Sequence, residues 1–103
     1  MININQEYLR TIREILEKHV PYCEVRVFGS RKKGENKKYS DLDLALAAEE
    51  RIPDNVLLRL RQEFQNSDLP FRIDIIELNS VSEEFRKIIN SDYEVLYAPS
   101  EGA

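Results

Sequence analysis

The sequence predicts an α/β (α+β) fold, in which a small mixed β-sheet is flanked by helices. Two observations lead to this prediction. In three segments the apolar residues recur at spacings of three and four, which is the period of an amphipathic helix. Between these segments lie short runs that are rich in β-branched residues or alternate in polarity, as strands do. The order helix–strand–strand–helix–strand–helix indicates helices packed against one sheet.

The composition is that of one domain spanning residues 1–103, with residues 98–103 expected to form a flexible tail. Hydrophobic residues make up 42% of the chain, which is enough for a core, and the net charge of −4 argues against direct nucleic-acid binding. No apolar run approaches membrane-spanning length, and the N-terminus lacks the features of a signal peptide. We therefore expect a soluble cytoplasmic protein with no membrane contact.

The first helix is predicted over residues 5–19 and ends before Pro21. A short strand follows at residues 24–28. His19 is the only histidine, and at a helix end it is expected to be structural or solvated, because no nucleophile lies nearby in the sequence. Cys23 has no second cysteine to pair with and is expected to be a small apolar filler.

The second strand is predicted over residues 41–48, where acids or small residues alternate with leucines. This period places Asp41, Asp43 and Ala45 on one face of the strand and the leucines on the other. A helix is the rival interpretation, because Ala and Leu are good helix formers. On a helix, however, residues two apart do not face each other, so the two acids could not serve one common role.

The second half of the chain repeats the alternation of helix and strand. A helix is predicted over residues 53–66, with Pro53 in its first turn, and a strand over residues 71–78. The last helix is predicted at about residues 82–90, and residues 95–97 either extend the sheet or pack on its edge. The buried stripe of this last helix is expected to consist of Phe85, Ile88 and Ile89.

Three aspartates, Asp41, Asp43 and Asp74, stand in strand-like apolar surroundings. An acid between isoleucines is costly unless something compensates it, and two acids on one strand face repel each other. A bound divalent cation resolves both problems, and carboxylate oxygens suit Mg²⁺ or Mn²⁺. Three carboxylates can hold two ions, one for the attacking oxygen and one for a leaving pyrophosphate. Asp74, on a separate strand, is the best candidate to assist deprotonation of the nucleophile.

A phosphate-binding turn is predicted where the first strand breaks, at Gly29 and Ser30. Glycine lets the backbone approach a phosphate closely, and free N–H groups at a turn favour anions. Ser30 can donate its hydroxyl to a phosphate oxygen, while Arg31 and the lysines that follow add positive charge. Phosphate donors and metal-binding acids would thus meet across a ten-residue spacer.

Each feature also has a simpler explanation when it is taken alone. A Gly-Ser turn is common, a lysine-rich loop is usually a solvated surface, and Asp-x-Asp can be a helix cap with a surface acid. Asp74 could pair with Arg72 or with Arg26. The conjunction of all these features, with three acids on predicted strands, is much harder to obtain by accident.

The spacing of Gly29 and Ser30 from Asp41-Leu-Asp43, with Asp74 on a later strand, resembles the signature of the DNA polymerase β-type nucleotidyltransferase superfamily. The short chain is similar to the minimal nucleotidyltransferases of the MNT type. The resemblance implies transfer of AMP from ATP to a hydroxyl with Mg²⁺. It also implies that the Gly-Ser pair contacts the triphosphate and that the three aspartates bind metal.

MNT-type proteins commonly pair with a helical HEPN-domain toxin, and the MNT protein is the antitoxin that can AMPylate a tyrosine of its partner. The resemblance therefore implies a hetero-oligomer with a HEPN protein, for which exposed Tyr93, Tyr97 and the tail are candidate contacts. Two alternatives remain open: an antitoxin that only binds and masks the toxin, and a nucleotidyltransferase of small molecules such as aminoglycosides.

Overall fold

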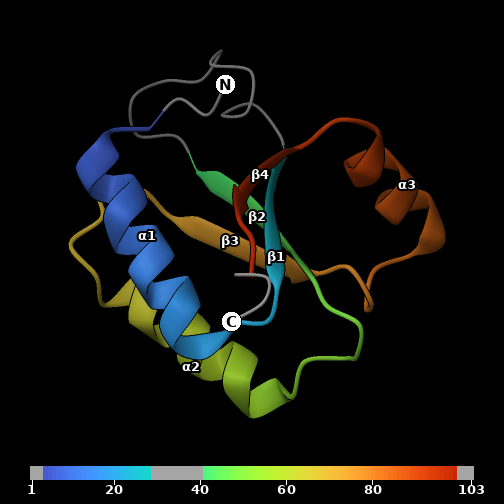
Figure 1. The fold of residues 1–103 in the computed structure, drawn as a ribbon, viewed down its shortest axis with the longest axis horizontal. Helices are drawn as coiled ribbons and strands as arrows, with labels where there is room; N and C mark the ends of the chain where they lie inside the picture. The colour runs from blue at the N-terminus through green and yellow to red at the C-terminus, as the bar shows by residue number, and fades with distance from the viewer. Residues whose placement is uncertain (1–3, 29–40, 100–103) are drawn as a thin grey trace.

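The computed structural model describes residues 4–28 and 41–99. Its elements confirm the predicted α/β fold and the predicted order, and residues 95–97 prove to belong to a fourth strand (Figure 1). No helix in these two ranges is long and apolar enough to cross a membrane. The elements are α1 (Gln6–His19), β1 (Glu24–Phe28), β2 (Leu42–Ala47), α2 (Asp54–Gln65), β3 (Ile73–Glu77), α3 (Glu83–Ser91) and β4 (Glu94–Tyr97).

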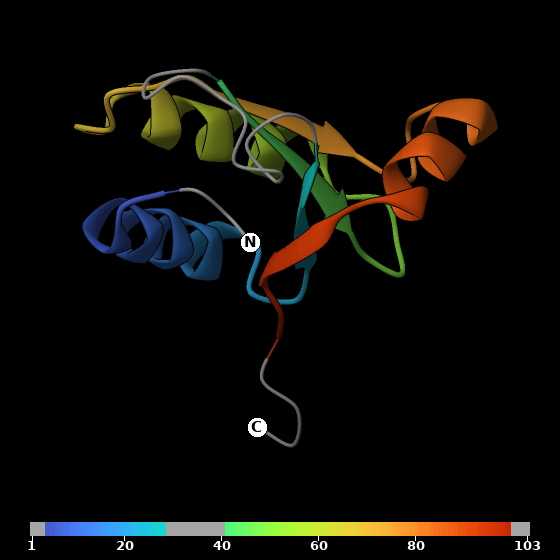
Figure 2. The same ribbon diagram turned by 90° about the horizontal axis from the view of Figure 1, so that it is seen from above.

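The four strands form one mixed sheet in the order β3-β2-β1-β4. The β1 strand pairs antiparallel with both β2 and β4, whereas β2 pairs parallel with β3. The parallel pair needs a crossover connection, which α2 provides. Figure 2 shows α1 and α2 together on one face of the sheet and α3 on the other. The strand order places β3 and β4 at the two edges of the sheet.

The main core lies between the sheet and the pair α1 and α2. Three leucines of β2 point into it, and the apolar faces of both helices cover them. Ala45 lies on the opposite face, in a smaller cluster with Leu78 and Ile89. This alternation is the one expected for a strand, so the helical interpretation of this segment is wrong. The buried leucines of β2 are Leu42, Leu44 and Leu46.

The strands β2 and β3 are shorter than predicted because the ladder that pairs them is short, whereas β1 has the predicted bounds. The register between β2 and β3 runs from Leu42 opposite Ile73 to Leu46 opposite Glu77. Pro53 is the N-cap of α2 and lies just outside the first turn in which it was predicted. These differences of one or two residues leave the predicted faces of both strands unchanged.

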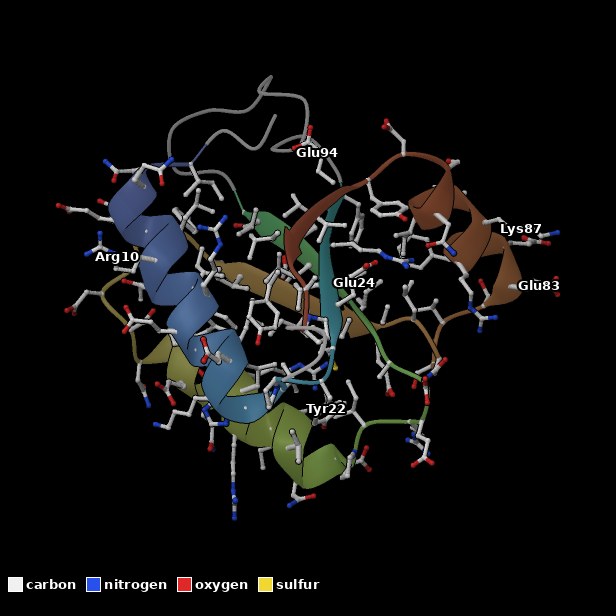
Figure 3. The ribbon with its side chains drawn as sticks, in the orientation of Figure 1. Arg10, Tyr22, Glu24, Glu83, Lys87 and Glu94 are labelled. Atoms are coloured by element: carbon white, nitrogen blue, oxygen red, sulfur yellow. The ribbon has the colours of Figure 1, made fainter. Side chains whose placement is uncertain are left out.

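The predicted buried stripe of α3 is wrong for two of its three residues. Ile89 is 1% exposed, but Phe85 is 38% exposed and Ile88 is 65% exposed. The surface beneath α3 is small, since Ala45 and Leu78 are the buried residues that meet Ile89 there. Phe85 still contacts the sheet through Phe28, with ring centroids 6.1 Å apart. Figure 3 shows the outer side of the helix, from which Glu83 and Lys87 project.

Two residues with a possible chemical role prove to be structural. The Nε2 atom of His19 lies 2.7 Å from Oε1 of Glu63, which links α1 to α2 as a structural histidine would. Cys23 is buried, and its burial, together with the nearby Glu77 carboxylate, raises the pKa of the thiol to about 11. Both simpler expectations are confirmed.

The expectation that Tyr93 and Tyr97 are exposed is wrong, because both are partly buried and engaged within the chain. The guanidinium of Arg26 stacks on the Tyr93 ring, 4.5 Å from its centroid. The Tyr97 hydroxyl donates to the carbonyl oxygen of Pro21 at 3.4 Å. These rings therefore hold the β4 edge of the fold in place.

Candidate active site

The parallel pairing of β2 with β3 brings the predicted acids together at one end of the sheet. Asp43 and Asp74 are register partners, so their side chains leave the sheet on the same face. Asp41 stands immediately before β2 and has the same parity as Asp43. Phe28, which precedes Gly29 in the sequence, is the register partner of Asp43 on β1. The acids thus lie at the sheet end where β1 stops.

The remaining predicted site residues are Gly29, Ser30 and Arg31, which lie outside the described residues. Their contacts with phosphate therefore stay a prediction. The strand β1, which precedes them in the sequence, ends with Phe28 opposite Asp43.

Arg72 lies among the acids and contacts two of them. Its Nε atom is 3.0 Å from Oδ1 of Asp74 and 3.9 Å from Oδ2 of Asp41. Of the two partners considered for Asp74, Arg72 is the correct one, because Arg26 instead pairs with Glu24 at 2.6 Å. The bridge from Arg72 to Asp41 was not foreseen. The two-residue spacing from Asp74 places Arg72 on the same strand face, but the contact with Asp41 arises from the pairing of β2 with β3.

The electrostatics of the site centre on Asp43. Its partial burial raises the pKa of the carboxyl, and the charges of Asp74 and Asp41 raise it further, while Arg72 opposes them. The same acids raise the pKa of the Arg72 guanidinium, chiefly through its hydrogen bond with Asp74. The charge of Arg72 therefore does not fully offset what raises the pKa of Asp43.

The donor set fits a divalent cation in chemistry and in strand placement. Carboxylates on adjacent strands and on one face are the hard oxygen ligands that Mg²⁺ and Mn²⁺ prefer. In the two described ranges, however, no three His, Cys, Asp or Glu side chains are yet arranged to hold one ion. Arg72 contacts Asp74 and Asp41 in this arrangement. Mg²⁺ usually takes only one or two carboxylates and completes its shell with water and substrate phosphates.

Comparisons with known proteins agree with this geometry. The family described as "Polymerase beta, Nucleotidyltransferase" matches residues 10–102. A Haemophilus influenzae protein named "Probable protein adenylyltransferase MntA" is 44% identical over 95 residues, which cover 92% of this chain and 83% of that protein. Identity at this level over nearly the whole chain shows common descent and not only a similar fold.

Solved structures share the fold at lower identity. A structure described as "toxin-antitoxin with AMP-PNP" superposes with a TM-score of 0.72 at 22% identity and covers 90% of this chain and 75% of that one. The structure of a "tri-AMPylated Shewanella oneidensis HEPN toxin in complex with MNT antitoxin" gives a TM-score of 0.68 at 21% identity, covering 92% and 73%. The chain belongs to the DNA polymerase β-type nucleotidyltransferase family, as its sequence predicted.

Proposed function

We propose that this protein transfers AMP from ATP to a tyrosine hydroxyl of a HEPN-domain toxin, with Mg²⁺, and thereby acts as its antitoxin. The observation that carries the proposal is the register pairing of Asp43 with Asp74 on one sheet face, beside Asp41. The MntA relative, which is named as a probable protein adenylyltransferase, supports a protein as the acceptor.

In the proposed reaction, the acids of the site have separate roles. The acceptor oxygen attacks the α-phosphorus of ATP, and the bond from that phosphorus to the bridging oxygen breaks, so that pyrophosphate leaves. The acceptor proton would pass to the Asp74 carboxylate, which is 38% exposed. When bound, Mg²⁺ supplies positive charge to the phosphates and would be held by Asp41, Asp43 and Asp74.

The positive charges around the acids have separate proposed roles. Gly29 and Ser30 would bind the triphosphate through backbone N–H groups and a hydroxyl, and Arg31 would add charge there. Arg72 is exposed over 73% of its side chain, so it can leave the acids when a cation replaces it.

A binding-only antitoxin is the second candidate, and one observation favours it. The exposed apolar residues Phe85 and Ile88 on α3 could cover a partner without any chemistry. The two candidates differ in whether neutralisation of the toxin needs the acids of the site.

The test mixes the protein with ATP, Mg²⁺ and the HEPN-domain protein encoded by the neighbouring reading frame, and records intact masses. We expect the partner to gain adenylyl groups with the wild type but not with Asp41→Asn combined with Asp43→Asn. The matched control is Asp54→Asn combined with Asp68→Asn, two exposed acids that carry the same charge change. A partner of unchanged mass, or one that is modified equally by the site variant, would exclude adenylyl transfer by this site.

The same variants separate the two candidates in cells that produce the toxin. Catalysis predicts that the site variant no longer neutralises the toxin at equal expression, whereas the control variant does. Neutralisation by both variants would establish the binding-only function.

A further inference from the structure

A cavity of about 700 Å³ runs along the outer edge of β3. Its walls include every residue from Phe71 to Ile76, together with Arg61, Phe64 and Gln65 of α2. Consecutive strand residues point to opposite faces of a sheet. A cavity that all of them line therefore lies along the strand edge and not on one face. Because Arg72 and Asp74 belong to the lining, this edge cavity opens onto the candidate active site.

The edge of β3 offers unused backbone hydrogen-bonding groups. The Leu42 N–H donates to the Arg72 carbonyl at 2.9 Å, and the Leu78 N–H donates to the Leu46 carbonyl at 3.0 Å. In a parallel ladder these two bonds direct the polar groups of the even-numbered residues of β3 toward β2. The groups of the odd-numbered residues, 73, 75 and 77, therefore point outward to the cavity.

Two of the outward carbonyls are already engaged. Arg61 Nη2 donates to the Ile75 carbonyl at 3.1 Å, and the Ser80 N–H donates to the Glu77 carbonyl at 3.0 Å. Within the described ranges, both polar groups of Ile73 and the N–H of Ile75 have no hydrogen-bond partner. An edge of this kind accepts an added strand, and it lies on the strand that carries Asp74.

We propose, resting on the function above, that the acceptor segment of the partner protein binds in extended form along β3 and pairs with Ile73 and Ile75. A residue of the segment beside Asp74 then points its hydroxyl to the face that carries the acids. Its two sequence neighbours point to the other face, where Phe64 and Leu69 line the cavity. The acceptor site thus selects a hydroxyl residue flanked by apolar neighbours.

The surroundings favour a partner segment over a second copy of this chain. Arg61 and Arg72 flank the edge from its two sides. Arg72 is already ion-paired with Asp74 and Asp41, but two copies that met edge to edge would bring two Arg61 guanidiniums to one edge, which is unfavourable. A segment of another protein carries no such repulsion, and five residues of strand suffice for a short peptide.

Amide exchange measured by NMR tests the proposal on the unaltered protein. The labelled chain is compared alone and with the HEPN protein, without ATP. In the complex we expect the amides of Ile73 and Ile75 to exchange at about one-tenth of their rate in the free chain, or more slowly still. Asp74 and Ile76 are internal controls, because their amides already bond β2. Unchanged exchange at 73 and 75 in a formed complex would overturn the proposal, as would protection that appears in a dimer of this chain alone.

A matched pair of variants tests the same edge during the reaction. Ile73→Pro removes an outward N–H without breaking a bond to β2, and Ile73→Val keeps that N–H. We expect Ile73→Pro to lower kcat/KM for the partner about tenfold relative to Ile73→Val, with the KM for ATP unchanged. Equal rates would overturn strand addition while leaving adenylyl transfer intact. If the wild type forms no adenylyl adduct, the proposed transfer is excluded. The amide-exchange experiment uses no ATP and would still show whether the partner segment pairs with the β3 edge.

Discussion

At the scale of single residues, Asp43 stands where an ionised carboxylate is disfavoured. Burial and the neighbouring charges of Asp74 and Asp41 raise the pKa of this carboxyl in the folded state. An acid whose pKa is raised on folding lowers stability once it is ionised. The loss grows as pH rises from the unfolded pKa, about 3.9, to the folded pKa, and stays constant above it.

Asp43→Asn should therefore stabilise the metal-free protein at pH 7. We expect the free energy of unfolding to rise by less than about 1 kcal/mol, because solvent screens part of the repulsion between the carboxylates. Urea denaturation in EDTA at pH 7 measures the gain, and at a pH below about 4 the difference should shrink, since both side chains are then neutral. The exposed Asp68→Asn is the control. A loss of stability that is equal at both pH values would show that the Asp43 carboxylate is not strained.

Arg72 and a divalent cation should compete for the same acids, since the guanidinium already contacts Asp74 and Asp41. We expect Arg72→Gln to lower the stability of the metal-free protein and to tighten Mg²⁺ binding roughly two- to fivefold, the scale of an exposed ion pair. Titration calorimetry with Mg²⁺ measures the affinity. Arg59→Gln, an exposed site on α2, serves as the control. Weaker Mg²⁺ binding in Arg72→Gln would show that the arginine assists the metal and does not compete with it.

At the scale of elements, α3 is the least anchored helix of the fold. Among its described residues only Ile89 is buried, whereas α1 contributes four buried residues. Helices gain most of their stability from such packing. Ile88 and Ile89 are adjacent and chemically identical, and their exposures are 65% and 1%. They form a natural pair for measuring how α3 is held.

Ile89→Ala should cost about 2–4 kcal/mol of unfolding free energy, because it opens a cavity between α3 and the sheet. Ile88→Ala should change stability by less than about 0.5 kcal/mol, as surface substitutions do. Chemical denaturation of the two variants under one set of conditions makes the comparison. Similar losses in both would mean that Ile88 is covered in solution, for instance by a second copy of the chain.

The error over α3 shows what periodicity can and cannot predict. The spacing of Phe85, Ile88 and Ile89 correctly indicates one helix and its apolar side. It does not give the width of the surface that will cover that side. Here the buried residues described under the helix are few, Ala45 and Leu78, so a single isoleucine of α3 is covered completely. The fourth strand was uncertain for a related reason, because only its pairing with β1 decides its place.

At the scale of the whole molecule, the shared face of the three acids could be predicted because strand period fixes the side of the sheet to which each residue points. Predicting this face required no distant contacts beyond the presence of a crossover helix between the strand of Asp41 and Asp43 and the strand of Asp74. The bridge from Arg72 to Asp41 and the open edge of β3 could not be predicted in the same way. Both depend on the strand order β3-β2-β1-β4, which arises from pairings between segments far apart in the chain.

The register of Asp43 opposite Asp74 also determines when, during synthesis of the chain, the three acids can come together. Translation delivers β1 and β2 first, and these two strands can pair as soon as both have left the ribosome. Asp74 is residue 74 of 103, and it reaches its neighbour only after α2 has been made and has folded back across the sheet. Non-local closure of this kind is slow compared with hairpin formation. A growing chain that has not yet reached β3 carries two of the three candidate acids, Asp41 and Asp43, without Asp74.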